Sequence, residues 1–91
     1  MDARAHIIVS GMVQGVGFRY FAYRTATRMS LNGWVKNLTH GEVEIEVEGP
    51  KGIIESFIKE LPVGNPSAVV RNIEVDWKKT AGQYSSFEIT F

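Results

Sequence analysis

The stretch Glu42-Val43-Glu44-Ile45-Glu46-Val47-Glu48 decides the fold, because its acidic and apolar side chains alternate strictly. Successive side chains of an extended strand point to opposite faces of a sheet. The two valines and the isoleucine therefore share one face, and the four glutamates share the other. We expect one buried and one wet face, so helices should pack against the sheet on one side only.

Two helices are predicted, one on each side of this strand in the chain. Apolar residues recur at helical spacing in residues 18–29, where the basic side chains fall mainly on the other side. Pro50 is suited to the first position of a second helix, and Pro62 ends it. The apolar stripe of that second helix consists of Ile53, Ile54, Phe57, Ile58 and Leu61.

The remaining segments are predicted to be strands. Residues 5–10 hold a run of β-branched side chains and are expected to form a central strand buried on both faces or nearly so. A turn at Asn32-Gly33 should lead into residues 34–38, and residues 69–77 and 87–91 alternate as later strands. The element order is β-α-β-β-α-β plus a short C-terminal strand. This order predicts an α+β, ferredoxin-like sandwich with an antiparallel sheet and both helices on one face.

Length and composition narrow the possible functions. With 91 residues, residues 1–91 are expected to form a single domain, and the 44% of hydrophobic residues suffice for a core. The chain has no cysteine, which removes disulfides, thiol nucleophiles and Cys-bound metal, and favours a reducing, cytoplasmic location. Ten basic and ten acidic residues cancel, so we expect neither nucleic acid nor a membrane as a partner. No window approaches the roughly 20 apolar residues of a membrane span.

A glycine-rich loop between the first strand and the first helix is the main candidate for an anion site. Residues 11–17 hold three glycines, too many for a helix or a regular strand. The amides of such a loop can converge beside the positive end of the helix dipole. Arg19, in the first helical turn, is poorly placed beside that positive end unless an anion binds there. The alternative at this point is that the glycines only form a tight connection between strand and helix, and that Arg19 is solvated.

Two sequence motifs strengthen the functional interpretation. Gly11-Met12-Val13-Gln14-Gly15-Val16-Gly17-Phe18-Arg19 resembles the first signature of the acylphosphatase family. Gly33-Trp34-Val35-Lys36-Asn37, followed by Gly41, Val43 and Gly49, resembles the second. The resemblance extends to Gly64-Asn65-Pro66-Ser67 and to Tyr84-Ser85-Ser86-Phe87, so it spans nearly the whole chain.

The resemblance implies roles for particular residues. It implies that the substrate phosphate is bound by Arg19 and by the backbone of the loop, namely Gln14, Gly15, Val16, Gly17 and Phe18. It implies that Asn37 orients the attacking water. Lys36 is a rival cation, but strand alternation points it to the opposite face from Asn37. The implied activity is hydrolysis of the carboxyl-phosphate bond of small acyl phosphates.

The chemistry expected of this site needs no cofactor. Phosphoryl transfer through a loose transition state asks mainly for positioning and for donors around the phosphate oxygens. The leaving carboxylate is a weak base, so no general acid is required. His6 and His40 lack a second His or a Cys at metal-ligand spacing, and we predict no metal site. We expect a metal-independent monomer whose partner is a small acyl phosphate.

Two other functions are alternatives within the same fold. Residues 15–21 loosely resemble the aromatic element of RNA-recognition motifs, but that element belongs on the third strand, which here presents glutamates. A non-catalytic, accessory acylphosphatase-like domain of a larger enzyme is the second alternative. Because no further domain follows Phe91 in this sequence, a free-standing enzyme is the expectation.

Overall fold

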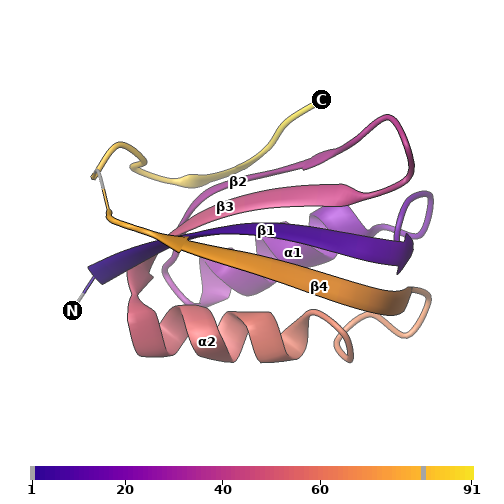
Figure 1. Cartoon of the computed structure of the whole chain (residues 1–91), viewed down its shortest axis with the longest axis horizontal. Helices are drawn as coiled ribbons and strands as arrows, with labels where there is room; N and C mark the ends of the chain where they lie inside the picture. Colours follow the sequence, from indigo (N-terminus) through magenta and orange to yellow (C-terminus); the bar gives the residue numbers. More distant parts are fainter. Residues whose placement is uncertain (1, 81) are drawn as a thin grey trace.

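The structure, a computed structural model, describes residues 2–80 and 82–91. It consists of a five-stranded sheet and two helices (Figure 1). The elements are β1 (Asp2–Met12), α1 (Phe18–Arg28), β2 (Asn32–Asn37), β3 (Val43–Pro50), α2 (Lys51–Glu60), β4 (Val69–Lys78) and β5 (Phe87–Ile89). The strand order is β4-β1-β3-β2-β5. The first four strands are antiparallel to their neighbours as predicted, whereas the short β5 pairs parallel with β2, so the sheet is mixed.

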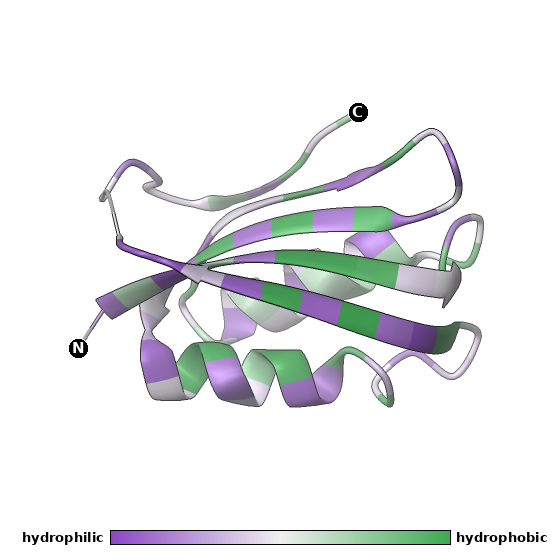
Figure 2. Ribbon diagram, viewed as in Figure 1, coloured by the Kyte–Doolittle hydropathy of each residue, from purple (hydrophilic) through white to green (hydrophobic). Residues whose placement is uncertain are grey.

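The core lies between the sheet and the two helices, which cover one face (Figure 1). Val43, Ile45 and Val47 are fully buried, as the alternation of β3 predicts, and Figure 2 shows that alternation along the strand. Helix α1 contributes Phe18, Ala22 and Ala26, and α2 contributes Ile54 and Phe57. Ile53, predicted in the apolar stripe of α2, is instead 40% exposed because it points away from the sheet.

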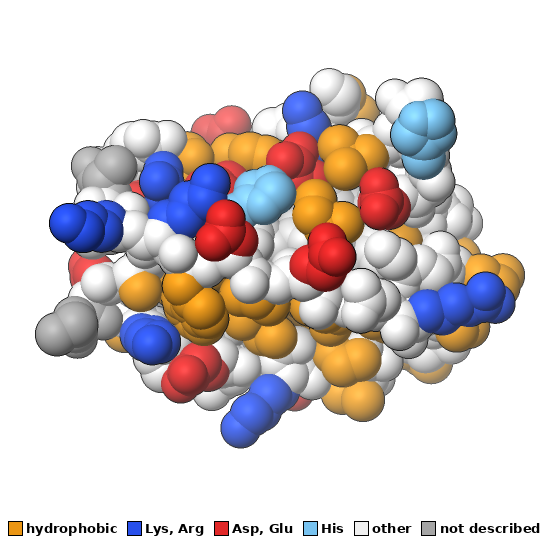
Figure 3. All heavy atoms as spheres, in the orientation of Figure 1, with side chains coloured by type: hydrophobic (Ala, Val, Ile, Leu, Met, Phe, Trp, Pro, Cys, Tyr) orange, Lys and Arg blue, Asp and Glu red, His pale blue; other side chains and the backbone are white. Residues whose placement is uncertain are grey.

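The opposite face of the sheet is less exposed to solvent than predicted. Glu46 is 6% and Glu48 is 5% exposed, so half of the acidic row is buried. Polar partners make this burial tolerable. Glu46 forms an ion pair with Arg4, whose Nε lies 3.7 Å from Oε1, too far for a hydrogen bond. Glu48 Oε2 accepts hydrogen bonds from the Thr80 hydroxyl (3.0 Å) and the Gly82 amide (3.2 Å). Figure 3 shows charged side chains and histidine gathered over this face.

Two further local predictions are corrected. In β1, Ile7 and Val9 are buried against the helices, but Ile8 lies on the other face and is only half-buried, so the strand is not buried on both sides. The turn lies at Ser30 (φ 59°) rather than at Asn32-Gly33. Gly33 is inside β2 with φ 144°, and a β-carbon there would overlap the carbonyl oxygen of Glu46. The absence of a side chain at Gly33 therefore allows β2 to pack close to β3.

Strand directions bring three strand ends to one edge of the sheet. β1 and β2 are both antiparallel to β3, so they run the same way, and β5 runs parallel to β2. Their carboxyl ends, at Met12, Asn37 and Ile89, therefore share an edge (Figure 1). The loop into α1 starts at that edge, so residues that are distant in the chain meet beside the helix N-terminus.

Candidate active site

The loop between β1 and α1 presents free backbone donors. Gly15 and Gly17 both have φ of 75°, a left-handed conformation that favours glycine, and Gly17 is the N-cap of α1. The amides from Gly15 to Arg19 donate no hydrogen bond to any other residue of the described ranges 2–80 and 82–91. Helix N-terminal amides of this kind form an anion-binding site, helped by the helix dipole.

The side chain of Gln14 fastens this loop to the neighbouring hairpin. Its Nε2 donates to the carbonyl oxygens of Leu38 (2.7 Å) and Glu42 (2.8 Å), which belong to the connection between β2 and β3. Both amide hydrogens are thereby used. Gln14 was predicted to act through its backbone, and the structure adds a side-chain contact that holds the loop beside the end of β2.

Arg19 is held from the C-terminal end of the chain. Its Nη1 donates a 3.1 Å hydrogen bond to the carbonyl oxygen of Thr90, and its guanidinium carbon lies 4.7 Å from the centre of the Phe91 ring. The guanidinium is a planar group with five N–H donors, so a single bond to Thr90 leaves most of them free. The half-buried Arg19 can therefore be oriented by protein and still bind an anion.

Asn37 ends β2 with an unpaired oxygen. Its Oδ1 is buried and accepts no hydrogen bond from residues 2–80 or 82–91, the residues that the structure describes. A buried acceptor without a partner is costly, which favours a ligand or water as its partner. Lys36 lies on the opposite face as predicted, where its Nζ is 3.8 Å from Glu44 Oε1. Lys36 is thus separated from the loop.

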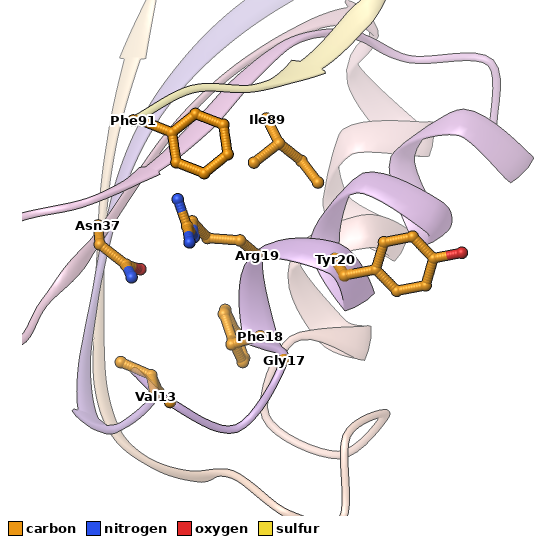
Figure 4. A pocket seen from close by; sticks show the side chains of 9 residues that line it. Val13, Gly17, Phe18, Arg19, Tyr20, Asn37, Ile89 and Phe91 are labelled. Atoms are coloured by element: carbon orange, nitrogen blue, oxygen red, sulfur yellow. The ribbon is translucent and has the colours of Figure 1, made fainter.

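These groups line one cavity of about 260 Å³. Figure 4 shows the side chains of Arg19 and Asn37 pointing into it from α1 and β2, with the Phe91 ring beside the guanidinium. Of the predicted site residues, the cavity is lined by Gly15, Gly17, Phe18, Arg19 and Asn37. Gln14 and Val16 belong to the same loop but do not line the cavity. The residues that were not predicted are Val13, Tyr20, Ile89 and Phe91.

The missed residues have mainly apolar side chains and line the cavity beside the polar groups. Ile89 and Phe91 reach the site because β5 runs parallel to β2, so the chain leaves the sheet at the same edge as Asn37. The alternation of residues 87–91 indicates a strand but contains no signal of its partner or direction. Tyr20, 57% exposed, follows Arg19 on α1 and was not distinguished from the other residues of the solvent face.

The described part of the chain contains neither a metal-binding cluster nor a helix that could span a membrane. Within residues 2–80 and 82–91, no three His, Asp or Glu side chains are grouped so that they could hold a metal ion. Neither of the helices in those ranges has the length and apolar character needed to cross a membrane.

Comparison with known proteins agrees with the geometry of the loop. The family model described as Acylphosphatase matches residues 5–89. The chain belongs to the acylphosphatase family. It is 44% identical over 88 residues to the acylphosphatase of Anaeromyxobacter dehalogenans, an alignment that covers 97% of this chain and 95% of that protein. The crystal structure of acylphosphatase from Bacillus subtilis covers 100% of both chains with a TM-score of 0.94 and 41% identity. The protein is thus an enzyme of the acylphosphatase family.

The same fold also occurs inside a longer protein. The crystal structure of T. kodakarensis HypF matches 100% of this chain with a TM-score of 0.85 and 41% identity, and the match covers 12% of that protein. Acylphosphatase-like structure is therefore found both in chains of this size and as a small part of a larger chain.

Proposed function

We propose that the protein hydrolyses small acyl phosphates to a carboxylate and inorganic phosphate at the cavity beside the N-terminus of α1. One observation carries this proposal: unpaired loop amides, a guanidinium and an unpaired carboxamide oxygen border the same cavity of about 260 Å³. Family membership supplies the reaction class, and the arrangement of these groups supports the roles that follow.

The phosphoryl group is bound by the backbone of residues 14–18 and by Arg19. Amides at a helix N-terminus bind phosphate oxygens through both hydrogen bonding and the dipole. Arg19 adds a fork of donors that matches two oxygens of a phosphate. Its hydrogen bond to Thr90 orients the guanidinium before substrate arrives, with a weaker contact to the exposed Phe91 ring, so less side-chain freedom is lost on binding.

Asn37 positions the water. Its unpaired Oδ1 accepts a hydrogen bond from a water molecule placed in line with the bond to be broken. The water oxygen forms a bond to phosphorus, the bond from phosphorus to the acyl oxygen breaks, and the electron pair leaves with the carboxylate. An amide is a poor base, so Asn37 orients the water, and the proton passes to the phosphate or to solvent.

The leaving group explains why the site manages without a general acid. A carboxylic acid has a pKa of about 4, whereas a phenol has a pKa of about 10. The carboxylate of an acyl phosphate therefore departs unprotonated. A phosphate monoester has a far poorer leaving group, and the phenol of Tyr20, which lines the cavity, directs its hydroxyl away from Arg19 and Asn37 (Figure 4). We propose that the site discriminates acyl phosphates from monoesters for this reason.

Benzoyl phosphate and phenyl phosphate provide a matched test, because both carry one aryl ring and one phosphate. Release of inorganic phosphate should be fast from benzoyl phosphate and negligible from phenyl phosphate, and Arg19→Ala should abolish the first. Equal rates on the two compounds, or full activity of Arg19→Ala, would contradict the proposal.

An accessory domain is the second candidate, favoured by the likeness to part of T. kodakarensis HypF. The two candidates differ in whether this chain alone turns over free acyl phosphates, which the assay above decides. An RNA-binding module is disfavoured, since the open sheet face carries Glu44, Glu46 and Glu48. A monomeric, cytoplasmic protein without a cofactor remains a prediction.

A further inference from the structure

The loop that follows α2 contacts the loop between β1 and α1, residues 13–17, through one side chain. Asn65 Nδ2 donates a 3.1 Å hydrogen bond to the carbonyl oxygen of Val16. Asn65 Oδ1 accepts from the amide of Ser67 at 3.1 Å, and the backbone carbonyl of Asn65 accepts from Ala68 at 3.0 Å. Both loops lie at the same end of the molecule (Figure 1). The Asn65 carboxamide is therefore oriented by the turn in which it lies, and both its nitrogen and its oxygen form hydrogen bonds.

The placement of Asn65 is itself constrained. The amide of Gly64 donates to the carbonyl of Glu60 at 2.8 Å, which continues the last turn of α2. A β-carbon at Gly64 would press against the ring of Phe21 on α1. Glycine at this position thus lets the chain pass close to α1, and Asn65 follows directly. The close approach of Gly64 to α1 thus places the Asn65 side chain beside Val16.

We infer that Asn65 is a positioning residue for the anion site, an inference that rests on the proposed function. The carbonyl of Val16 and the amide of Gly17 belong to one peptide group, which is planar and trans, so they point in opposite directions. Holding the carbonyl from one side aims the amide to the other side. Asn65 therefore sets the direction of the Gly17 N–H without touching the substrate.

The two hollows beside the loop agree with this geometry. Asn65 and Val16 line a second hollow of about 350 Å³, which lies between the loop and the two helices. Neither of them lines the cavity that contains Arg19 and Asn37, whereas Gly17 lines both. The peptide of Val16 and Gly17 thus separates the two hollows, with Asn65 on the side away from the reacting groups.

A tether of this kind matters because the loop is rich in glycine. Gly15 and Gly17 have wide conformational freedom, so a loop without outside contacts samples many amide directions. Donors that stabilise a transition state must be fixed before the reaction. Gln14 fixes the start of the loop through the hairpin, and Asn65 fixes its last peptide before the helix.

Two variants isolate the donor at Nδ2. Asn65→Asp keeps the shape and the oxygen that accepts from Ser67, but removes the donor. Asn65→Ala also removes the donor and introduces no charge. Asn72→Ala is the control, because Asn72 is an exposed asparagine on β4 without a side-chain hydrogen bond to the described residues. Each variant is measured for melting temperature, kcat and KM on benzoyl phosphate, and the response of the Gly17 amide in ¹H–¹⁵N spectra titrated with inorganic phosphate.

Both Asn65 variants should lower kcat/KM about tenfold, less than the roughly hundredfold to thousandfold cost of losing a donor outright. The shift of the Gly17 amide on adding phosphate should shrink in both, while Asn72→Ala matches the wild type. A lower melting temperature with unchanged kcat/KM and an unchanged Gly17 response overturns the inference. A loss confined to Asn65→Asp also overturns it, since charge would then be the cause.

The proposed function and the role of Asn65 can fail independently. If the wild type does not hydrolyse benzoyl phosphate, the proposed function is wrong. The Gly17 response to inorganic phosphate still decides the role of Asn65 in that case. A wild-type response that shrinks in both variants supports the inference. A response that is absent from the wild type, or that persists in the variants, overturns it.

Discussion

Gln14 donates a 2.7 Å hydrogen bond from Nε2 to the carbonyl oxygen of Leu38, the residue directly after Asn37. This contact joins the loop that presents the amides to the strand end that presents Asn37, the residue that we propose positions the water. A second bond, to the carbonyl of Glu42, reaches the other side of the same hairpin. One neutral side chain therefore ties the two halves of the site together, in addition to the sheet pairing of β1 and β2 with β3.

Replacing Gln14 by methionine should cost both stability and activity. The variant keeps a similar length but removes two hydrogen bonds, so the carbonyl oxygens of Leu38 and Glu42 keep only their backbone donors, the amides of Gly41 and Leu38. At about 0.5–1.5 kcal/mol for each hydrogen bond, the free energy of unfolding should fall by about 1–3 kcal/mol. Urea unfolding measures this loss, and kcat/KM should fall with it. An unchanged unfolding midpoint would show that the hydrogen bonds contribute nothing in solution.

Arg19→Lys should be nearly as inactive as Arg19→Ala. A lysine ammonium supplies charge but neither the planar fork nor the stacking surface for Phe91. Steady-state kinetics on benzoyl phosphate compare the two variants. Near-normal turnover by the lysine variant would leave only a requirement for positive charge.

Asn37→Ala should separate binding from chemistry. The amide loop and Arg19 remain, so inorganic phosphate should raise the melting temperature of this variant as much as that of the wild type. Its kcat should fall by roughly a hundredfold to a thousandfold, the typical cost of losing one preorganised polar group. Arg19→Ala should show the reverse pattern, with little stabilisation by phosphate. If Asn37→Ala loses the stabilisation and Arg19→Ala keeps it, the two roles are wrongly assigned.

Phe91→Ala tests how much the ring contributes to the orientation of Arg19. The ring lies 4.7 Å from the guanidinium but is 99% exposed, so the contact is screened by water. Cation–π contacts at exposed sites contribute about 0.5–1 kcal/mol, which corresponds to roughly a twofold to fivefold loss in kcat/KM. A much larger loss, measured at unchanged melting temperature, would mean that the ring also binds the acyl group.

Chelation should leave the rate unchanged. The proposed mechanism stabilises phosphate charge with amides and a guanidinium rather than with a cation, and residues 2–80 and 82–91 hold no cluster of three ligands. Phosphate release is measured before and after dialysis against EDTA. Activity that disappears and returns on adding a divalent metal contradicts the mechanism.

The sheet and both helices could be predicted from periodicity, because burial against one layer of helices imposes it directly. Val43, Ile45 and Val47 alternate for that reason, and all three are buried. The burial of Glu46 and Glu48 was not predictable in this way. Their cover comes from Arg4 and from the segment after β4, and alternation contains no information about such distant partners.

The candidate site was predictable where its residues lie close together in the sequence. The glycines of the loop and the position of Arg19 at the start of α1 are local features, and the structure places them around one cavity. The contribution of Ile89 and Phe91 was missed, because it depends on the parallel pairing of β5 with β2. The tether from Asn65 to Val16 likewise depends on tertiary packing between two loops.

The position of β5 also sets when the site can form during synthesis. The loop, Arg19 and Asn37 all leave the ribosome early. β1 can pair with β3 at that stage, but its pairing with β4, in which Arg4 lies opposite Lys78, forms only after the later strand has emerged. The hydrogen bond that holds Arg19 needs Thr90, which emerges later still. A nascent chain that lacks residues 87–91 therefore has the loop between β1 and α1, but its Arg19 guanidinium lacks the hydrogen bond that orients it. We expect catalytic activity only after β5 has joined the sheet.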